Sequence, residues 1–288
     1  MAFSHFMEII NMKYKYKIVV DSASNLPSDY IKDENIGFQV VPLTVNIGDK
    51  EFVDNDSASV EEMLDTLSSF KGKCSTACPS PAFFADAYKD AEQVICITIS
   101  SKMSGCFNAA YLASTQEENT KIHVVDSLSV CGGEVILVDK CLKYMKQGLP
   151  FEKIEEKLEQ DKLNENFLFV LNDFGNLVRA GRMNKIVAFV AMSLSIKPIC
   201  IAKDGEIKIY EKQRTMRKAL NRIVEIIKDF ATDLEDRECI ITYVDNIENA
   251  NHLKELVEQA YHFKNVRIMQ NRILCSYYTL PGGMHLVF

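Results

Sequence analysis

The sequence predicts an α/β protein with two domains, a mostly parallel sheet in the first and a mixed sheet in the second. In the first half, apolar strands are each followed by a polar turn and a helix, which is the order that builds parallel sheets. The second half adds a hairpin around Asp204-Gly205, and hairpins pair strands antiparallel. The length of 288 residues suits two modest domains.

In the first half, short apolar runs bounded by turn residues predict strands. Helices are expected where apolar residues recur at helical spacing, as Val60, Met63, Leu64 and Leu67 do. Ser80 can cap a helix that begins at Pro81. The expected strands are 17–20, 38–45 with an interruption at Pro42, 94–99 and 122–125, and the other helices are 59–70, one from about Phe107, and 135–145.

In the second half, strands and helices alternate less regularly. The expected strands are 167–170, 195–201, 206–210, 239–244 and 266–269, and the expected helical segments are a stretch around 179–182 followed by 186–194, then 214–230 and 246–261. We place the boundary between the halves within 148–166. The predicted domains are therefore residues 14–160 and 161–288.

Composition excludes several classes of protein. The net charge of −7 and a pI near 5.4 disfavour nucleic acid as a partner, because phosphate binding needs a concentrated positive face. No apolar run approaches the roughly 20 residues that span a bilayer, so stable membrane insertion is not expected. The first residues lack a signal-peptide core, so we expect a cytoplasmic protein. The nine cysteines are then reduced thiols, and no second Cys or His pair follows Cys74 and Cys78 at zinc spacing.

Polar turns follow three of the predicted strands, at 21–25, 100–105 and 126–133, and a hydroxyl-rich loop at 75–80 precedes a helix. Ligands of open parallel sheets bind beyond the carboxyl ends of the strands. Each turn taken singly is explained by ordinary turn and cap chemistry. Taken together, the turns predict a patch of hydroxyl and backbone N–H groups that suits an anion.

The same turns lack the motifs of several enzyme classes. There is no Gly-x-Gly-x-x-Gly after the first strand and no Walker phosphate loop. The turn around Ser104 reads Lys-Met-Ser-Gly-Cys, which is not the Gly-x-Ser-x-Gly nucleophile elbow. The five histidines lie outside the polar turns, so a Ser–His pair is poorly supported. We assign no catalytic residue and no metal ligand.

An ordered set of motifs, spanning about Lys15 to Phe288, resembles the DegV family. Its opening DSxxDLP is DSASNLP here, its SSxxSG turn is intact, and its final HTGPG is changed to YTLPG. The corresponding residues are 21–27, 41–43 (VPL), 76–81 (TACPSP), 100–105 (SSKMSG), 126–127 (DS), 177–183 (LVRAGRM), 196–199 (IKPI) and 278–282.

The resemblance implies a fatty-acid-binding protein with a ligand cleft between its two domains. The acyl chain is expected in an apolar tunnel, and the carboxylate at the cleft. No cofactor is implied, and the partner is a separate ATP-dependent fatty acid kinase that converts the bound acid into an acyl phosphate. The ligand-binding residues carried over are Thr76, Ser104, Gly105, Arg182, Tyr278 and Thr279. Candidate tunnel residues are Phe83, Phe84, Phe107, Ile186, Phe189, Met192 and Leu194, although burial in the core is the more ordinary explanation for any one of them.

Three departures from the family pattern bear on function. Tyr278 replaces the family histidine and donates a hydrogen bond without carrying charge near neutral pH. Leu280 replaces a glycine, and Ala77 removes a hydroxyl. Binding tolerates these changes better than support of phosphoryl transfer does. Two other functions therefore stay open, a Ser104-dependent acyl hydrolase or transferase and a ligand-stabilised regulatory protein.

Overall fold

The first half of the chain forms a parallel four-stranded sheet, as predicted. The computed structural model describes residues 13–118, 120–183 and 196–288. The strand order is β2-β1-β6-β7, and all neighbours are parallel. The strands are β1 (Tyr14–Asp21), β2 (Ile36–Val41), β6 (Ala91–Thr98) and β7 (Lys121–Asp126).

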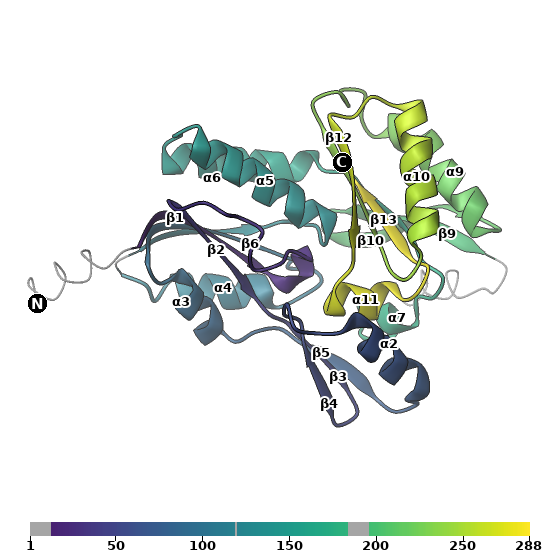
Figure 1. Cartoon of the computed structure of the whole chain (residues 1–288), viewed down its shortest axis with the longest axis horizontal. Helices are drawn as coiled ribbons and strands as arrows, with labels where there is room; N and C mark the ends of the chain where they lie inside the picture. Colours follow the sequence, from purple (N-terminus) through teal and green to yellow (C-terminus); the bar gives the residue numbers. More distant parts are fainter. Residues whose placement is uncertain (1–12, 119, 184–195) are drawn as a thin grey trace, which may run out of the picture.

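Helices cover both faces of this sheet (Figure 1). Helices α3 (Pro81–Tyr88) and α4 (Cys106–Ser114) lie on one face, and α5 (Gly132–Lys146) and α6 (Phe151–Asp161) lie on the other. Alternate residues of β1 serve the two faces: Ile18 and Val20 pack with α5 and α6, whereas Val19 packs with α3 and α4. This double burial explains why the strands read as continuous apolar runs.

A small antiparallel sheet extends from the first half, in the order β4-β3-β5. Its strands are β3 (Thr44–Ile47), β4 (Lys50–Val53) and β5 (Cys74–Ala77), with helix α2 (Val60–Ser69) between β4 and β5. The single interrupted strand expected at 38–45 is therefore wrong, because β2 and β3 belong to different sheets. The loop expected at 75–80 is also partly strand, because β5 pairs with β3.

The second half forms a mixed six-stranded sheet in the order β10-β9-β8-β13-β11-β12. Only β11 and β12 pair in parallel in this sheet. The predicted hairpin is confirmed: Asp204 and Gly205 have φ of 55° and 76°, as a two-residue hairpin turn requires. The strands are β8 (Phe167–Val170), β9 (Lys197–Lys203), β10 (Glu206–Gln213), β11 (Glu238–Tyr243), β12 (Asn265–Gln270) and β13 (Met284–Val287).

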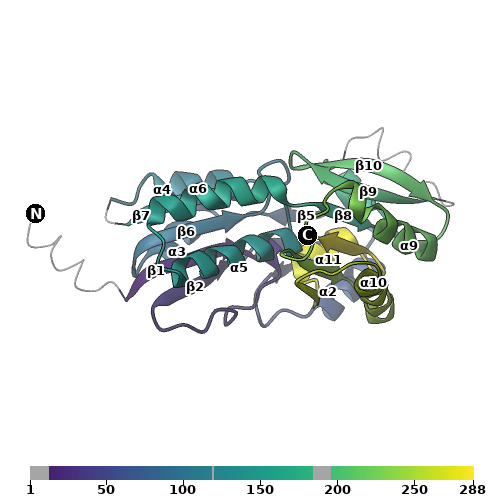
Figure 2. The same cartoon turned by 90° about the horizontal axis from the view of Figure 1, so that it is seen from above.

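The helices of the second half are α7 (Gly175–Arg179), α9 (Met216–Ile226), α10 (Ile247–Ala260) and α11 (Ile273–Thr279). Helices α9 and α10 pack on one face of the mixed sheet. The second half of the chain lies beside the first along the long axis of the molecule (Figure 2). The sequence did not predict α6, which fills most of the expected boundary segment, or α11 and β13. The predicted segment 186–194 lies outside the described residues, and the domain limits of 14–160 and 161–288 stay a prediction.

Helix α11 joins the two halves. It lies between β12 and β13, both strands of the mixed sheet, but its apolar side chains belong to the core of the first half. Ile273, Leu274 and Tyr277 are each at most 3% exposed, in a cluster with Val45 and Met63. The packing of α11 therefore fixes one half against the other.

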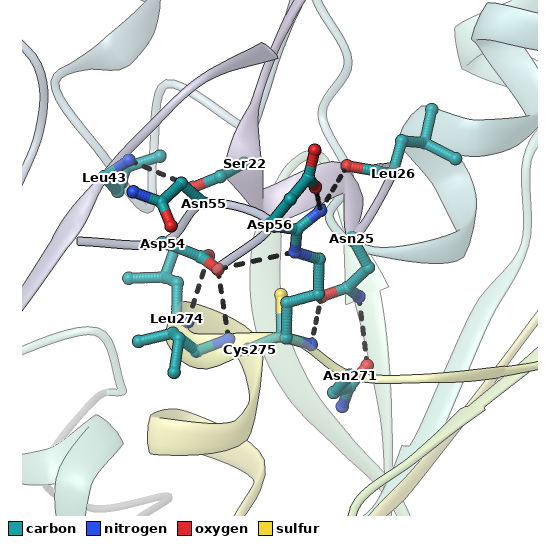
Figure 3. Close-up of polar contacts among 12 residues, drawn as sticks. Ser22, Asn25, Leu26, Leu43, Asp54, Asn55, Asp56, Asn271, Leu274 and Cys275 are labelled. Atoms are coloured by element: carbon teal, nitrogen blue, oxygen red, sulfur yellow. Dashed lines mark hydrogen bonds and ion pairs between the residues drawn. The ribbon is translucent and has the colours of Figure 1, made fainter. Parts of the chain in front are cut away.

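A polar network holds the start of α11 (Figure 3). The two carboxylate oxygens of the fully buried Asp54 accept the backbone N–H groups of Ile273 and Leu274, both at 3.1 Å. Arg272 donates to the carbonyl of Leu26 at 2.8 Å and to Asp56 at 2.7 Å. A carboxylate suits this position because the first N–H groups of a helix lack partners within the helix.

We expect Asp54→Ala to lower the free energy of unfolding by about 2–4 kcal/mol, because two buried N–H groups lose their acceptor and Arg272 loses an ion-pair partner 3.7 Å away. Asp56→Ala is the matched control. It removes the other carboxylate that contacts Arg272, but the Asp56 side chain is 45% exposed, so its loss should cost less than about 1 kcal/mol. Urea denaturation followed by circular dichroism measures both. Equal losses in the two variants would contradict the assignment.

Candidate functional site

A cavity of about 200 Å³ lies where the two halves meet. From the first half, its walls come from the turns after β6 and β7 and from β5. From the second half, they come from β8, the β9–β10 hairpin, α7 and α11. The lining is mainly apolar, and its apolar residues include Leu43, Ile99, Met103, Leu128, Val130, Phe167, Phe169, Leu171, Leu177, Ala202, Ile207 and Leu274.

Two hydroxyl groups meet across the junction at the cavity. Thr76 on β5 and Tyr278 on α11 both line the cavity, and their side-chain oxygens are 2.8 Å apart. Burial raises the pKa of Tyr278, while the Thr76 hydroxyl and the Arg182 charge lower it to a smaller extent. The phenol is therefore neutral at physiological pH and available as a hydrogen-bond donor.

The turn after β6 brings Ser104 and Gly105 to the cavity. The N–H groups of Met103 and Ser104 both donate to the Ser100 carbonyl, at 2.9 and 3.1 Å, which closes the turn. Ser104 Oγ lies 3.3 Å from the Cys106 N–H and 3.2 Å from Cys106 Sγ. The hydroxyl thus stands at the N-terminal end of α4, where partial positive charge favours an anion.

Arg182 brings a positive charge from the second half to the same turn. Its Nε donates to the carbonyl of Met103, and its Nη1 donates to the carbonyl of Ala180 at 2.9 Å. Arg182 lines the cavity but is otherwise exposed to solvent. Its guanidinium therefore links α7 to the Ser104 turn and places a cation beside the hydroxyl groups.

Thr279 also lines the cavity, but its hydroxyl is engaged within the second half. It lies 3.2 Å from Nε2 of His285 and 3.3 Å from the side-chain nitrogen of Asn271. The other ring nitrogen of His285 lies 2.7 Å from the Thr242 hydroxyl. His285 is a cavity residue that the sequence reasoning missed, because β13 was not predicted.

The two aspartates at the predicted polar turns fix the backbone and do not line the cavity. Asp21 accepts the N–H groups of Ala23 and Ile99, at 3.0 and 2.9 Å. Asp126 accepts those of Ser101 and Leu128, at 3.0 and 3.1 Å. Both side chains therefore shape the turns that carry the cavity residues.

The structure brings together all six residues that the sequence singled out: Thr76, Ser104, Gly105, Arg182, Tyr278 and Thr279. The predicted apolar tunnel residues fare differently. Phe83 is 60% exposed, and Phe84 is fully buried in the core of the first half, where Phe107 also packs. None of these three lines the cavity. The other four, Ile186, Phe189, Met192 and Leu194, lie outside the described residues.

Among residues 13–118, 120–183 and 196–288, no group of three or more His, Cys, Asp or Glu side chains is placed to hold a metal ion. Within the same residues, no helix has the length and apolar character needed to cross a membrane.

The fold and cavity define a class of α/β protein in which a mainly apolar cavity lies between a parallel and a mixed sheet. The chain belongs to the DegV family, whose family model matches residues 15–287. A DegV domain-containing protein of Streptococcus pyogenes serotype M1 is 31% identical over 274 residues, which are 93% of this chain and 97% of the relative.

Solved structures agree with the fold. A DegV family protein from Ruminococcus gnavus, with vaccenic acid, has a TM-score of 0.87 at 28% identity and covers 96% of this chain and 100% of its own. The fatty acid kinase (Fak) B3 protein of Streptococcus pneumoniae, loaded with linoleic acid, has a TM-score of 0.88 at 29% identity, covering 95% and 99%. A DegV family protein from Eubacterium eligens was crystallised with heptadecanoic acid, with a TM-score of 0.87 at 28% identity, covering 94% and 98%.

Asp21, the buried acid that accepts the N–H groups of Ala23 and Ile99, predicts that the free energy of unfolding depends on pH. Burial raises the pKa of Asp21 to about 7, against the opposing effect of the N–H groups of Ile99 and Ala23. The folded protein therefore keeps a proton that the unfolded chain, with a pKa near 3.9, has already lost. Stability from this group is fully present below about pH 4 and is lost as the pH rises through about 7, by roughly 2–4 kcal/mol.

Urea denaturation between pH 5 and 8 measures this effect. Burial also raises the pKa of Asp54, to about 6, so Asp21 is one of several contributors in this range. Asp21→Asn removes its share and should reduce the fall in the free energy of unfolding between pH 5 and 8, whatever the absolute stability of the variant. Asp29→Asn removes an exposed carboxylate and should keep the wild-type slope. An unchanged slope in the Asp21 variant would exclude Asp21 as a contributor.

Proposed function

We propose that this chain binds a long-chain fatty acid, with the acyl chain in the cavity and the carboxylate at its hydroxyl-lined edge. One observation carries the proposal: a mainly apolar cavity between the two halves has Thr76, Ser104 and Tyr278 on its wall, with Arg182 beside them. The fatty acids in the related structures from Ruminococcus gnavus, Eubacterium eligens and Streptococcus pneumoniae support it.

The cavity suits an alkyl chain. It has a volume of about 200 Å³ and a mainly apolar lining. Each buried methylene contributes about 0.8 kcal/mol, or roughly 10 kcal/mol for a long chain before the costs of association and ordering. The tail therefore supplies most of the affinity.

The carboxylate would be held by hydrogen bonds at the junction. An ionised acid removed from water needs donors, and the hydroxyls of Thr76, Ser104 and Tyr278 supply them. Gly105 lies at the start of α4, and Thr279 lies on the cavity wall beside Tyr278, with its hydroxyl engaged by His285 and Asn271. Arg182 adds a positive charge on the solvent side of the cavity.

We further propose that the chain is a carrier without a cofactor, that it works in the cytoplasm, and that it presents the acid to a separate ATP-dependent kinase. The structural likeness to the fatty acid kinase B3 protein supports this. The Ser104 hydroxyl is hydrogen-bonded to Cys106, and both ring nitrogens of His285 are hydrogen-bonded, to Thr242 and Thr279. Because Ser104 and His285 are not paired with each other, these contacts do not favour an acyl hydrolase.

Protein purified from a bacterial host should carry a stoichiometric long-chain acid. The protein is denatured, extracted with organic solvent and analysed by mass spectrometry, with a lipid-free protein of similar size prepared in parallel. After removal of lipid, oleate should bind again with one molecule per chain in isothermal titration. Failure to retain or rebind any long-chain acid would refute the proposed function.

Removing a head-group donor should weaken oleate binding without loss of fold. We expect Thr76→Val, Ser104→Ala and Tyr278→Phe each to cost about 1–3 kcal/mol of binding free energy, because a buried carboxylate loses a donor. Ser101→Ala is the control: it removes a hydroxyl from the same turn as Ser104, but Ser101 does not line the cavity. Calorimetry with oleate measures the affinities, and a Ser101 effect equal to that of Ser104 would contradict the assignment.

A kinase assay separates a carrier from a ligand-stabilised regulatory protein. Oleate-loaded chain, ATP and a purified fatty acid kinase subunit should yield acyl phosphate if the chain is a carrier. Omission of the kinase subunit should abolish product. Binding of oleate with no product in the presence of an active kinase would favour the regulatory function.

A further inference from the structure

Two buried cysteines face each other in the wall of the cavity. Sγ of Cys131 and Sγ of Cys275 are 3.0 Å apart, although the residues are 144 positions apart in the sequence. Two sulfur atoms in a disulfide are about 2.05 Å apart, so the remaining gap is about 1 Å. Both residues line the cavity and are at most 4% exposed.

The two thiols come from different elements that are held by one backbone carbonyl. The Cys131 N–H donates to the Ala23 carbonyl at 3.0 Å, and Sγ of Cys275 lies 3.2 Å from the same oxygen. Cys131 precedes α5 with φ of 52°, a conformation that residues other than glycine rarely adopt. Such strain persists only where the surroundings enforce it, and here the result is that the two sulfurs point at each other.

The pair is chemically asymmetric. Burial raises the pKa of the Cys275 thiol, and the neighbouring Cys131 raises it further. Burial also opposes ionisation of Cys131, but the hydrogen bond with Cys275 and the nearby His285 outweigh it and lower the pKa of the Cys131 thiol. The thiolate is the reactive form of cysteine, so Cys131 is the nucleophile of the pair and Cys275 the thiol that resolves it.

We propose that Cys131 and Cys275 are a redox-modifiable pair that closes to a disulfide on exposure to a peroxide. The Cys131 thiolate attacks one peroxide oxygen, the O–O bond breaks, and a sulfenic acid and hydroxide form. The Cys275 sulfur then attacks the Cys131 sulfur, the S–O bond breaks, and the second hydroxide leaves and takes up the Cys275 proton as water. Two thiols are oxidised by two electrons, hydrogen peroxide is reduced to two waters, and a thiol reductant reverses the bond.

The disulfide would fix the wall of the cavity. It would tie the start of α5 to α11, the helix that brings Tyr278 and Thr279 to the cavity. Resting on the proposed function, the same bond would slow exchange of the fatty acid, since it would tie together two elements of the cavity wall. A bound acyl chain would in turn shield both sulfurs from the oxidant.

The first test needs no variant. Delipidated wild-type protein is treated with hydrogen peroxide, blocked with iodoacetamide, digested and mapped by mass spectrometry. A peptide pair linked through Cys131 and Cys275, with the loss of two hydrogen atoms and recovery by dithiothreitol, is the expected result. If oxidation instead stops at other cysteines, such as the exposed Cys78, or leaves both thiols free, the proposal is overturned.

Variants test the consequence for the fold. Oxidation of the wild type should raise its thermal midpoint by about 5 °C, because a cross-link that closes a long loop constrains the unfolded chain. Cys131→Ser and Cys275→Ser should show no shift. Cys239→Ala is the matched control, since Cys239 is a buried cysteine of another core and should keep the full shift. A shift that survives in either serine variant would contradict the assignment.

An experiment with bound oleate distinguishes failure of this inference from failure of the proposed function. Oleate-loaded protein should form the disulfide several-fold more slowly than delipidated protein, and the oxidised protein should release oleate several-fold more slowly than the reduced protein. If the disulfide forms but the protein does not bind oleate, the redox pair is supported and the proposed function is contradicted. Equal oxidation rates with and without bound oleate would remove the link between the pair and the cavity.

Discussion

The buried carboxylate of Asp54 anchors the helix at which the two halves meet. It accepts the first N–H groups of α11, and the side chains of that helix then fill the core of the first half. Tyr278 is only a few residues further along the same helix. Its 2.8 Å contact with Thr76 therefore depends on a hydrogen bond made at the far end of α11. The cavity is thus a consequence of how α11 is anchored, since neither half alone supplies both of these walls.

The sequence predicted the elements that carry a clear local signal, either a continuous apolar run or a pair of turn residues. The strands of the parallel sheet read as apolar runs because helices cover both faces, and the hairpin at Asp204-Gly205 follows from its turn residues. Helix α11 gave no such signal. All but one of its seven residues are buried, so no polar face marks the helical period. Strand β5 was missed for a different reason: its sequence Cys-Ser-Thr-Ala is extended only because β3 pairs with it.

The candidate site was predictable to an uneven degree. The polar residues could be named because they lie in motifs that resemble those of the DegV family. The apolar wall could not, since a phenylalanine that lines a cavity and one that fills a core look alike in sequence. Phe167 and Phe169 line the cavity, whereas Phe84 is core. Which one does which depends on how the mixed sheet faces the parallel one, and that is a property of the assembled fold.

Tyr278 stands where the motif that the sequence resembles has a histidine, and under the proposed function this difference would change the chemistry at the carboxylate. Burial raises the pKa of the phenol above its ordinary value, so Tyr278 donates a hydrogen bond but keeps its proton. Phosphoryl transfer to a fatty acid requires the carboxylate to be ionised, because the anion is the attacking group. A donor that never gives up its proton stabilises that anion and does not neutralise it. The positive charge then has to come from Arg182, whose guanidinium contacts the backbone of the Ser104 turn. Under the proposed function, Tyr278 on α11 would thus hold the acid, and Arg182, which follows α7, would supply the positive charge.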